Sequence, residues 1–136
     1  MFLLGFPLLL IPFAIYNIIA FLMPGVSFSE PLITVELISH ARLAVSTGDV
    51  LVIFAILILF VEILKATRIG TRSIVDHMLS LILFIGMLAE FMIVAKTASS
   101  TFLLLVTLSF VDVIGGFAVT LRTSQRDIAL ERIEHV

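Results

Sequence analysis

The chain has 136 residues, of which 61% are hydrophobic and only 13% are charged, and its formal net charge is −2. Soluble domains average about 45–50% apolar and about 25% charged residues, so this composition excludes a water-soluble globule. A membrane helix needs ~20 mostly apolar residues, so this length holds about four spans and no separate catalytic domain. We therefore expect an all-α integral membrane protein, a bundle of four transmembrane helices in one domain.

Several function classes are excluded by what the sequence lacks. It has no cysteine, which removes disulfides, thiolate metal sites and thiol catalysis. Its basic residues are spread over short loops rather than gathered into a patch, which argues against nucleic-acid binding. The histidines at positions 40, 77 and 135 do not converge, so we expect no metal and no haem. Phosphate-binding loops and hydrolase motifs are also missing, so we expect neither a cofactor nor an enzyme.

The first expected span covers about residues 2–23, because no charge precedes Glu30. Pro7 and Pro12 each remove a backbone donor and predict kinks within this helix, and Pro24 ends it. A cleaved signal peptide is the competing interpretation. It is disfavoured because no basic residue precedes the apolar stretch and no small-residue cleavage motif follows it.

The segment between the first two spans supports two interpretations, of which we prefer a β-hairpin over about residues 32–47. In the hairpin the turn lies at residues 39–41, and nearly all apolar side chains share one face. The predicted cross-strand pairs are Leu37 with Leu43, Val35 with Val45 and Ile33 with Thr47. The alternative is an amphipathic surface helix, with Glu36, Ser39 and His40 opposite its apolar face.

Three further spans are expected at about residues 49–67, 74–95 and 101–121. Asp49 is placed as the N-cap of the first of these, and Ser73 with Asp76 resembles a capping box at the start of the second. The polar tail, residues 122–136, is expected to continue the last helix as a frayed helix along the membrane surface.

The distribution of basic residues predicts the orientation, because Lys and Arg near span ends are retained in the cytoplasm. Six of them flank the second connection or lie in the tail, namely Lys65, Arg68, Arg72, Arg122, Arg126 and Arg132. Arg42 and Lys96 fall on the other side. We therefore expect both termini in the cytoplasm and the hairpin outside, in a bacterial inner (plasma) membrane.

Three acids lie within the expected spans, namely Glu62, Glu90 and Asp112. Asp112 falls almost at the bilayer centre, where an acid costs about 2.5–3.5 kcal/mol, so it should face the bundle or an oligomer interface. The three acids occupy different depths and could pass a proton or cation. The favoured interpretation is that each accepts a hydrogen bond from a neighbouring helix and fixes packing. The candidate donors are Tyr16, Asn17, Ser80, Thr107 and Ser109.

Ser109, Gly115 and Gly116 lie with Asp112 on or near one stripe of the last expected helix. Small residues at such spacings let membrane helices approach closely. They are predicted packing positions, against either another helix of the chain or a second subunit.

These features favour a structural or accessory subunit of a larger membrane protein assembly, because short loops leave few soluble surfaces except the hairpin and the tail. Its expected partners are the lipid bilayer and other membrane subunits or further copies of the chain. The alternative is a small oligomeric transporter or channel that moves protons or cations through Glu62, Glu90 and Asp112.

Overall fold

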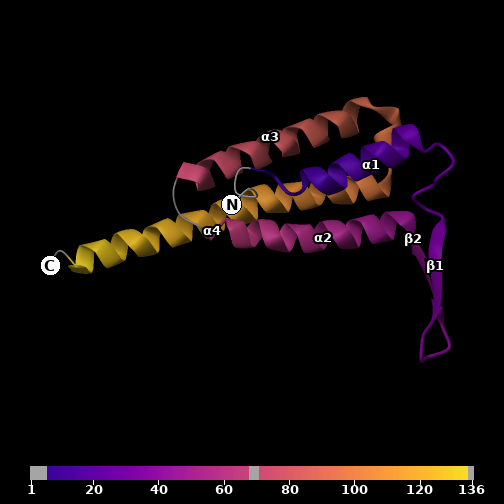
Figure 1. The fold of residues 1–136 in the computed structure, drawn as a ribbon, viewed down its shortest axis with the longest axis horizontal. Helices are drawn as coiled ribbons and strands as arrows, with labels where there is room; N and C mark the ends of the chain where they lie inside the picture. Colours follow the sequence, from indigo (N-terminus) through magenta and orange to yellow (C-terminus); the bar gives the residue numbers. More distant parts are fainter. Residues whose placement is uncertain (1–5, 68–70, 135–136) are drawn as a thin grey trace.

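The computed structural model describes residues 6–67 and 71–134, and most of these are helical (Figure 1). The four α-helices of the described residues lie roughly along one direction, and a two-stranded hairpin projects crosswise from one end of the bundle, called here the hairpin end. The elements in chain order are α1 (Leu10–Leu22), β1 (Pro31–Glu36), β2 (Arg42–Ser46), α2 (Thr47–Lys65), α3 (Thr71–Ile93), the short 3-10 helix η2 (Ala95–Thr97) and α4 (Ser100–Glu134).

Three helices of the described chain are long and apolar enough to cross a membrane. They are Thr47–Lys65, Ile74–Ile93 within α3 and Ser100–Arg122 within α4, close to the three later spans predicted from the sequence. Helix α1 has only 13 residues. At about 1.5 Å per residue it is ~20 Å long, which is short of a hydrocarbon layer of ~30 Å.

The start of α1 differs from the prediction. Residues 6–9 form turns instead of helix, in which the Leu10 N–H donates to the Pro7 carbonyl at 3.0 Å. Pro7 therefore precedes the helix, and Pro12 lies in its first turn, where backbone N–H groups have no intrahelical acceptor in any case. Neither proline kinks α1, so the predicted kinks are wrong. Residues 1–5 of the predicted span lie outside the described residues.

The hairpin prediction is confirmed, but its register was wrong by two residues. Val35 pairs with Leu43 and Ile33 with Val45, because the turn is tighter than expected. The Leu37 N–H donates to the Ala41 carbonyl at 2.9 Å, and His40 adopts a left-handed φ of 64°. This is a three-residue loop of a common hairpin type. A shift of two residues keeps every side chain on its predicted face, so the apolar face survives.

Helix α2 begins directly after β2, without a connecting loop. Its N-cap is Ser46, and the prediction of Asp49 in that role was wrong by three positions. The Ser46 hydroxyl accepts from the Asp49 N–H at 3.1 Å, and the Asp49 carboxylate accepts from the Ser46 N–H at 3.0 Å. This reciprocal capping box satisfies two backbone donors and couples the hairpin rigidly to α2.

The core is built on a close contact between α2 and α4, which run in the same direction because α3 returns the chain between them. Gly48 lies beside Thr101 at the hairpin end, and Ala66 beside Thr120 at the opposite end. Buried side chains recur every three or four residues on both helices. Aromatic rings close the core, with Tyr16 stacked 4.4 Å from Phe28 between ring centroids.

The tail prediction is confirmed in part, because α4 remains helical as far as Glu134. It continues straight past the ends of the other helices (Figure 1). The tail therefore follows the axis of the preceding part of α4 instead of turning away from it.

Gly48 sets the approach of α2 to α4, so Gly48→Ala tests this packing. The added Cβ would collide with the Thr101 hydroxyl and lie 2.9 Å from the Phe28 carbonyl oxygen. We expect a loss of about 1–3 kcal/mol in the free energy of unfolding, measured by circular dichroism in detergent. Gly115→Ala is the matched control, since a Cβ there meets nothing within 4 Å. Equal effects of the two variants would contradict this packing.

Candidate functional site

Ionisable side chains gather away from the hairpin end, where α2 ends and α3 begins. We call this group the polar cluster. Its members, which line one small cavity, are Glu62, Lys65, Asp76, His77, Ser80 and Asp112. The cavity has a volume of about 10 Å³, which is space for roughly one water molecule.

Glu62 and Lys65 hold the beginning of α1. The Glu62 carboxylate is 5% exposed and accepts hydrogen bonds from the Leu8 N–H and from Lys65 Nζ, the latter at 3.3 Å. Lys65 Nζ also donates to the Phe6 carbonyl at 2.7 Å and lies 4.0 Å from the Asp76 carboxylate. The ion pair therefore satisfies backbone groups of the turn that precedes α1, which explains why α1 begins where it does.

Asp112 lies inside the bundle, with 4% of its surface exposed. The Ser80 hydroxyl of α3 hydrogen-bonds to it, and Glu62 is close enough to interact with it electrostatically. Thr120 donates to the Ala66 carbonyl at 3.0 Å, across 54 residues of sequence. This register between α2 and α4 puts Glu62 only about one helical turn, ~5 Å, from the level of Asp112.

Glu90 does not join the polar cluster. Its carboxylate accepts from Asn17 Nδ2 at 3.4 Å, between α3 and α1. On α3 the buried Leu83 and Met87 separate it from Ser80. The structure thus brings two of the three predicted acids together and leaves the third with a partner of its own.

Only some of the predicted hydrogen-bond donors bond to one of the acids. Asn17 and Ser80 reach acids, whereas the Tyr16 hydroxyl bonds to Ser99 at 2.7 Å. The Thr107 hydroxyl donates at 2.9 Å to the Leu103 carbonyl of its own helix. A hydroxyl that bonds to the backbone of its own helix, as Thr107 does, does not link an acid to a neighbouring helix.

Two of the three predicted packing positions are buried between helices. Ser109 is 1% exposed, and a Cβ on Gly116 would lie 3.0 Å from His77 Cε1 and 3.7 Å from the Ala66 Cβ. Gly115 is different, because a Cβ there meets nothing within 4 Å. Consecutive residues point about 100° apart on a helix, so only one of two adjacent glycines can face the contact. Within the described chain, Gly115 is not a packing position.

Several members of the polar cluster were not predicted as site residues. In the sequence, Lys65 indicates only the orientation of the chain in the membrane, and Asp76 indicates only the start of a helix. Asp76 Oδ1 is buried without a hydrogen-bond partner among the described residues, and His77 Nε2 lies 2.7 Å from Thr120 Oγ1. The spacing of Glu62 and Lys65, three residues apart on one helix, is a signal that could have identified the pair.

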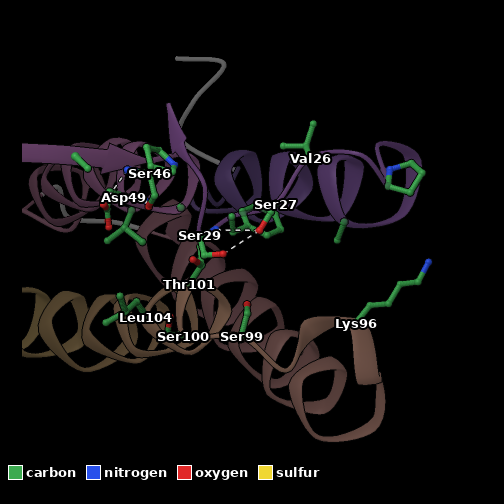
Figure 2. Close-up of a pocket in the computed structure, with 17 residues that line it drawn as sticks. Val26, Ser27, Ser29, Ser46, Asp49, Lys96, Ser99, Ser100, Thr101 and Leu104 are labelled. Atoms are coloured by element: carbon green, nitrogen blue, oxygen red, sulfur yellow. Dashed lines mark hydrogen bonds between the residues drawn. The ribbon is translucent and has the colours of Figure 1, made fainter. Parts of the chain in front are cut away.

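A second polar region lies at the hairpin end, between the end of α1, the base of the hairpin and the start of α4 (Figure 2). It is a cleft of about 760 Å³, called here the hydroxyl cleft. Its polar lining consists of Ser27, Ser29, Ser46, Asp49, Lys96, Ser99, Ser100 and Thr101. These residues come from separate segments, so their meeting could not be predicted from local sequence.

The two polar regions are separated by the apolar core. Leu51, Ala55 and Leu59 of α2 and Phe102 and Leu105 of α4 are all buried between them. In residues 6–67 and 71–134 no three His, Cys, Asp or Glu side chains form a group that could hold a metal ion. The arrangement supports buried ion pairing at one end and a solvent-accessible cleft at the other.

The sequence matches no family model, no curated protein and no solved structure. Functional proposals for this chain therefore rest on its geometry and chemistry.

Lys65 is the only cation that lines the cavity of the polar cluster among the described residues, so Lys65→Met tests its importance. The change leaves Glu62 and Asp76 without a positive partner in a buried setting. We expect a loss of about 3–5 kcal/mol in the free energy of unfolding. Arg126→Met in the exposed tail is the control and should stay within about 0.5 kcal/mol of the wild type. Detergent melts followed by circular dichroism measure both, and similar midpoints would overturn the assignment.

Proposed function

We propose that the chain is a four-span protein of a bacterial inner membrane, and that it acts as a structural or accessory subunit of a larger membrane assembly. One observation carries this proposal. The two parts that extend from the bundle, the hairpin and the end of α4, both carry exposed apolar side chains.

The hairpin presents an uncovered apolar face. Ile33, Val35 and Leu43 are 54%, 44% and 48% exposed, and they share one face of the paired strands. An isolated two-stranded hairpin is marginally stable in water. Contiguous exposed apolar surface on a protein marks an interaction site. A partner on this face supplies the burial that the hairpin lacks.

The last part of α4 is similarly unsupported. From residue 123 to Glu134 it extends beyond every other element (Figure 1). This segment therefore lacks the tertiary packing that supplies most of the stability of helices in proteins. The exposed Ile128, Leu130 and Ile133 add apolar surface to this segment. A cytoplasmic partner that covers it accounts for a helix of this length.

The start of α1 supports the fourth span. Inside a bilayer, backbone groups that are not paired within a helix need partners from the protein. Glu62 and Lys65 supply them for the Leu8 N–H and the Phe6 carbonyl. These hydrogen bonds satisfy the backbone groups that precede α1, as is required if α1 begins below the membrane surface. The stretch before Glu30 is uncharged, so it carries no charged side chain that opposes insertion.

A small oligomeric proton or cation transporter is the second candidate, favoured by the ionisable polar cluster. Three features weaken it. Glu62 is occupied by a backbone donor and by Lys65, the cavity holds roughly one water molecule, and the core beyond it is apolar. We therefore assign the buried acids to packing, in accord with the frequent role of polar groups between membrane helices.

The orientation is tested with single cysteines, since the chain has none of its own. Positive charge flanks the connection after α2 and occupies the tail, which favours the cytoplasm for both. We expect a cysteine at Ser39 to react with a membrane-impermeant maleimide in intact cells. A cysteine at Gln125 should react only after the membrane is permeabilised. The reverse pattern would overturn the orientation.

The subunit proposal is tested by cross-linking in native membranes, affinity purification and quantitative mass spectrometry. We expect reproducible partner proteins, and Val35→Lys should reduce their recovery several-fold because it places a charge on the apolar face of the hairpin. Thr34→Lys is the matched control, since adjacent strand residues point to opposite faces. Equal recovery with both variants would argue against a partner on this face.

The same preparation separates the two candidate functions. In proteoliposomes the wild-type protein should conduct protons and cations no faster than empty liposomes do. Asp112→Asn should assemble normally, because asparagine retains a hydrogen-bonding side chain for Ser80. Wild-type flux that is abolished by Asp112→Asn and Glu90→Gln would establish the transporter instead.

A further inference from the structure

The hydroxyl cleft has the two-sided chemistry of a site for an amphiphile. Hydroxyl groups line the part formed by the helix ends and loops, together with apolar side chains such as Val26 and Phe28. Ala20, Val52 and Leu104 line the part about one turn further into the helices. Its volume of about 760 Å³ falls within the range of small-molecule sites, roughly 300–1,000 Å³. If α2 and α4 span the membrane as proposed, the cleft lies at the outer surface of the bilayer.

One of the hydroxyl groups that line the cleft belongs to a largely buried residue. Thr101 is 7% exposed, and its hydroxyl has no hydrogen-bond partner among the described residues. Figure 2 shows its side chain directed from α4 toward Ser29. The neighbouring hydroxyls are occupied, because Ser27 and Ser29 bond to each other at 2.9 Å. The hydroxyl oxygen itself is not fully buried, so a ligand in the cleft can accept its hydrogen bond without displacing a protein partner.

The start of α4 adds further donors beside Thr101. The Ser99 hydroxyl accepts from the Phe102 N–H at 3.2 Å and so caps one group of the first turn. The N–H groups of Ser100 and Thr101 have no acceptor within the helix, because the first turn offers none. Such groups, together with the helix dipole, favour phosphate. Lys96 also lines the cleft and contributes a positive charge, although its Nζ lies over the Phe21 ring, 5.2 Å from the ring centroid.

The charges in the cleft are separated. Lys96 lies toward one side and Asp49 toward the other, with the hydroxyl groups between them (Figure 2). A ligand with a phosphate and an ammonium group matches this distribution. A simple anion matches only half of it.

We propose that the hydroxyl cleft binds the headgroup of a zwitterionic phospholipid. The phosphate is held by the Thr101 hydroxyl, the first turn of α4 and Lys96, and the ammonium group faces Asp49. One acyl chain lies along the apolar part of the cleft. This site rests on the proposed membrane location, but it is independent of the proposed role as a subunit.

The experiment measures binding of phosphatidylethanolamine to the delipidated full chain in detergent, by native mass spectrometry. We expect one tightly bound lipid per chain, and about tenfold weaker binding in Thr101→Val and in Lys96→Gln. Thr101→Ser keeps the hydroxyl and should bind as the wild type does. Thr107→Val is the matched control on the same helix, because that hydroxyl is exposed and bonds only to its own backbone.

Two further ligands test whether the phosphate must belong to a lipid and whether Asp49 contacts the ammonium group. Phosphatidylglycerol, which lacks the ammonium group, and glycerophosphoethanolamine, which lacks acyl chains, should each bind at least tenfold more weakly. Equal binding of glycerophosphoethanolamine would show a site for a soluble phosphate ester and overturn the lipid proposal. Equal binding of phosphatidylglycerol would overturn the role of Asp49. Equal losses in Thr101→Val and Thr107→Val would show non-specific lipid contact. Lys96→Gln keeps the test decisive if Thr101→Val fails to fold, since Lys96 is exposed.

Discussion

The parallel contact of α2 with α4 positions almost everything else in this protein. At one end the absence of a side chain on Gly48 lets α2 approach Thr101, and at the other end Ala66 contacts Gly116 and accepts a hydrogen bond from Thr120. Small residues at both ends allow this close approach, which in an apolar environment must be stabilised by packing and hydrogen bonds. The contact forms one wall of the polar cluster and one wall of the hydroxyl cleft. Both sites therefore depend on the same register.

The buried Glu62 and Lys65 side chains bond to backbone groups as well as to each other. Isolated ionised groups are very unfavourable in an apolar interior, and pairs survive there only when further hydrogen bonds accompany them. The pair of Glu62 and Lys65 meets this condition by bonding to the turn before α1. A charge pair that is committed in this way is poorly suited to the release of an ion. This favours a structural role for the acids and directs attention to the surfaces outside the bundle.

Those surfaces lie at opposite ends of the molecule. The hairpin is joined to α2 by the Ser46 and Asp49 capping box, so a partner bound to the hairpin is coupled mechanically to the bundle. The end of α4 continues a core helix without interruption, so a partner there is coupled equally directly. The hydroxyl cleft adds a proposed lipid at the base of the hairpin. These features together support the proposed role as a subunit that connects other proteins.

The sequence by itself determined the helical class and the three long apolar helices, because these follow from local composition and periodicity. It favoured the hairpin over a surface helix without deciding between them. It also singled out six residues for the interior of the bundle. Four of them are buried, namely Glu62, Ser109, Asp112 and Gly116, and two are only partly buried, namely Glu90 and Gly115. Only the tertiary structure decided their partners. The register of α2 against α4, the tight turn at His40 and the late start of α1 depend on contacts between residues far apart in the chain. Periodicity places a side chain on a face of its own helix or strand, but it carries no information about which residue of another element lies opposite.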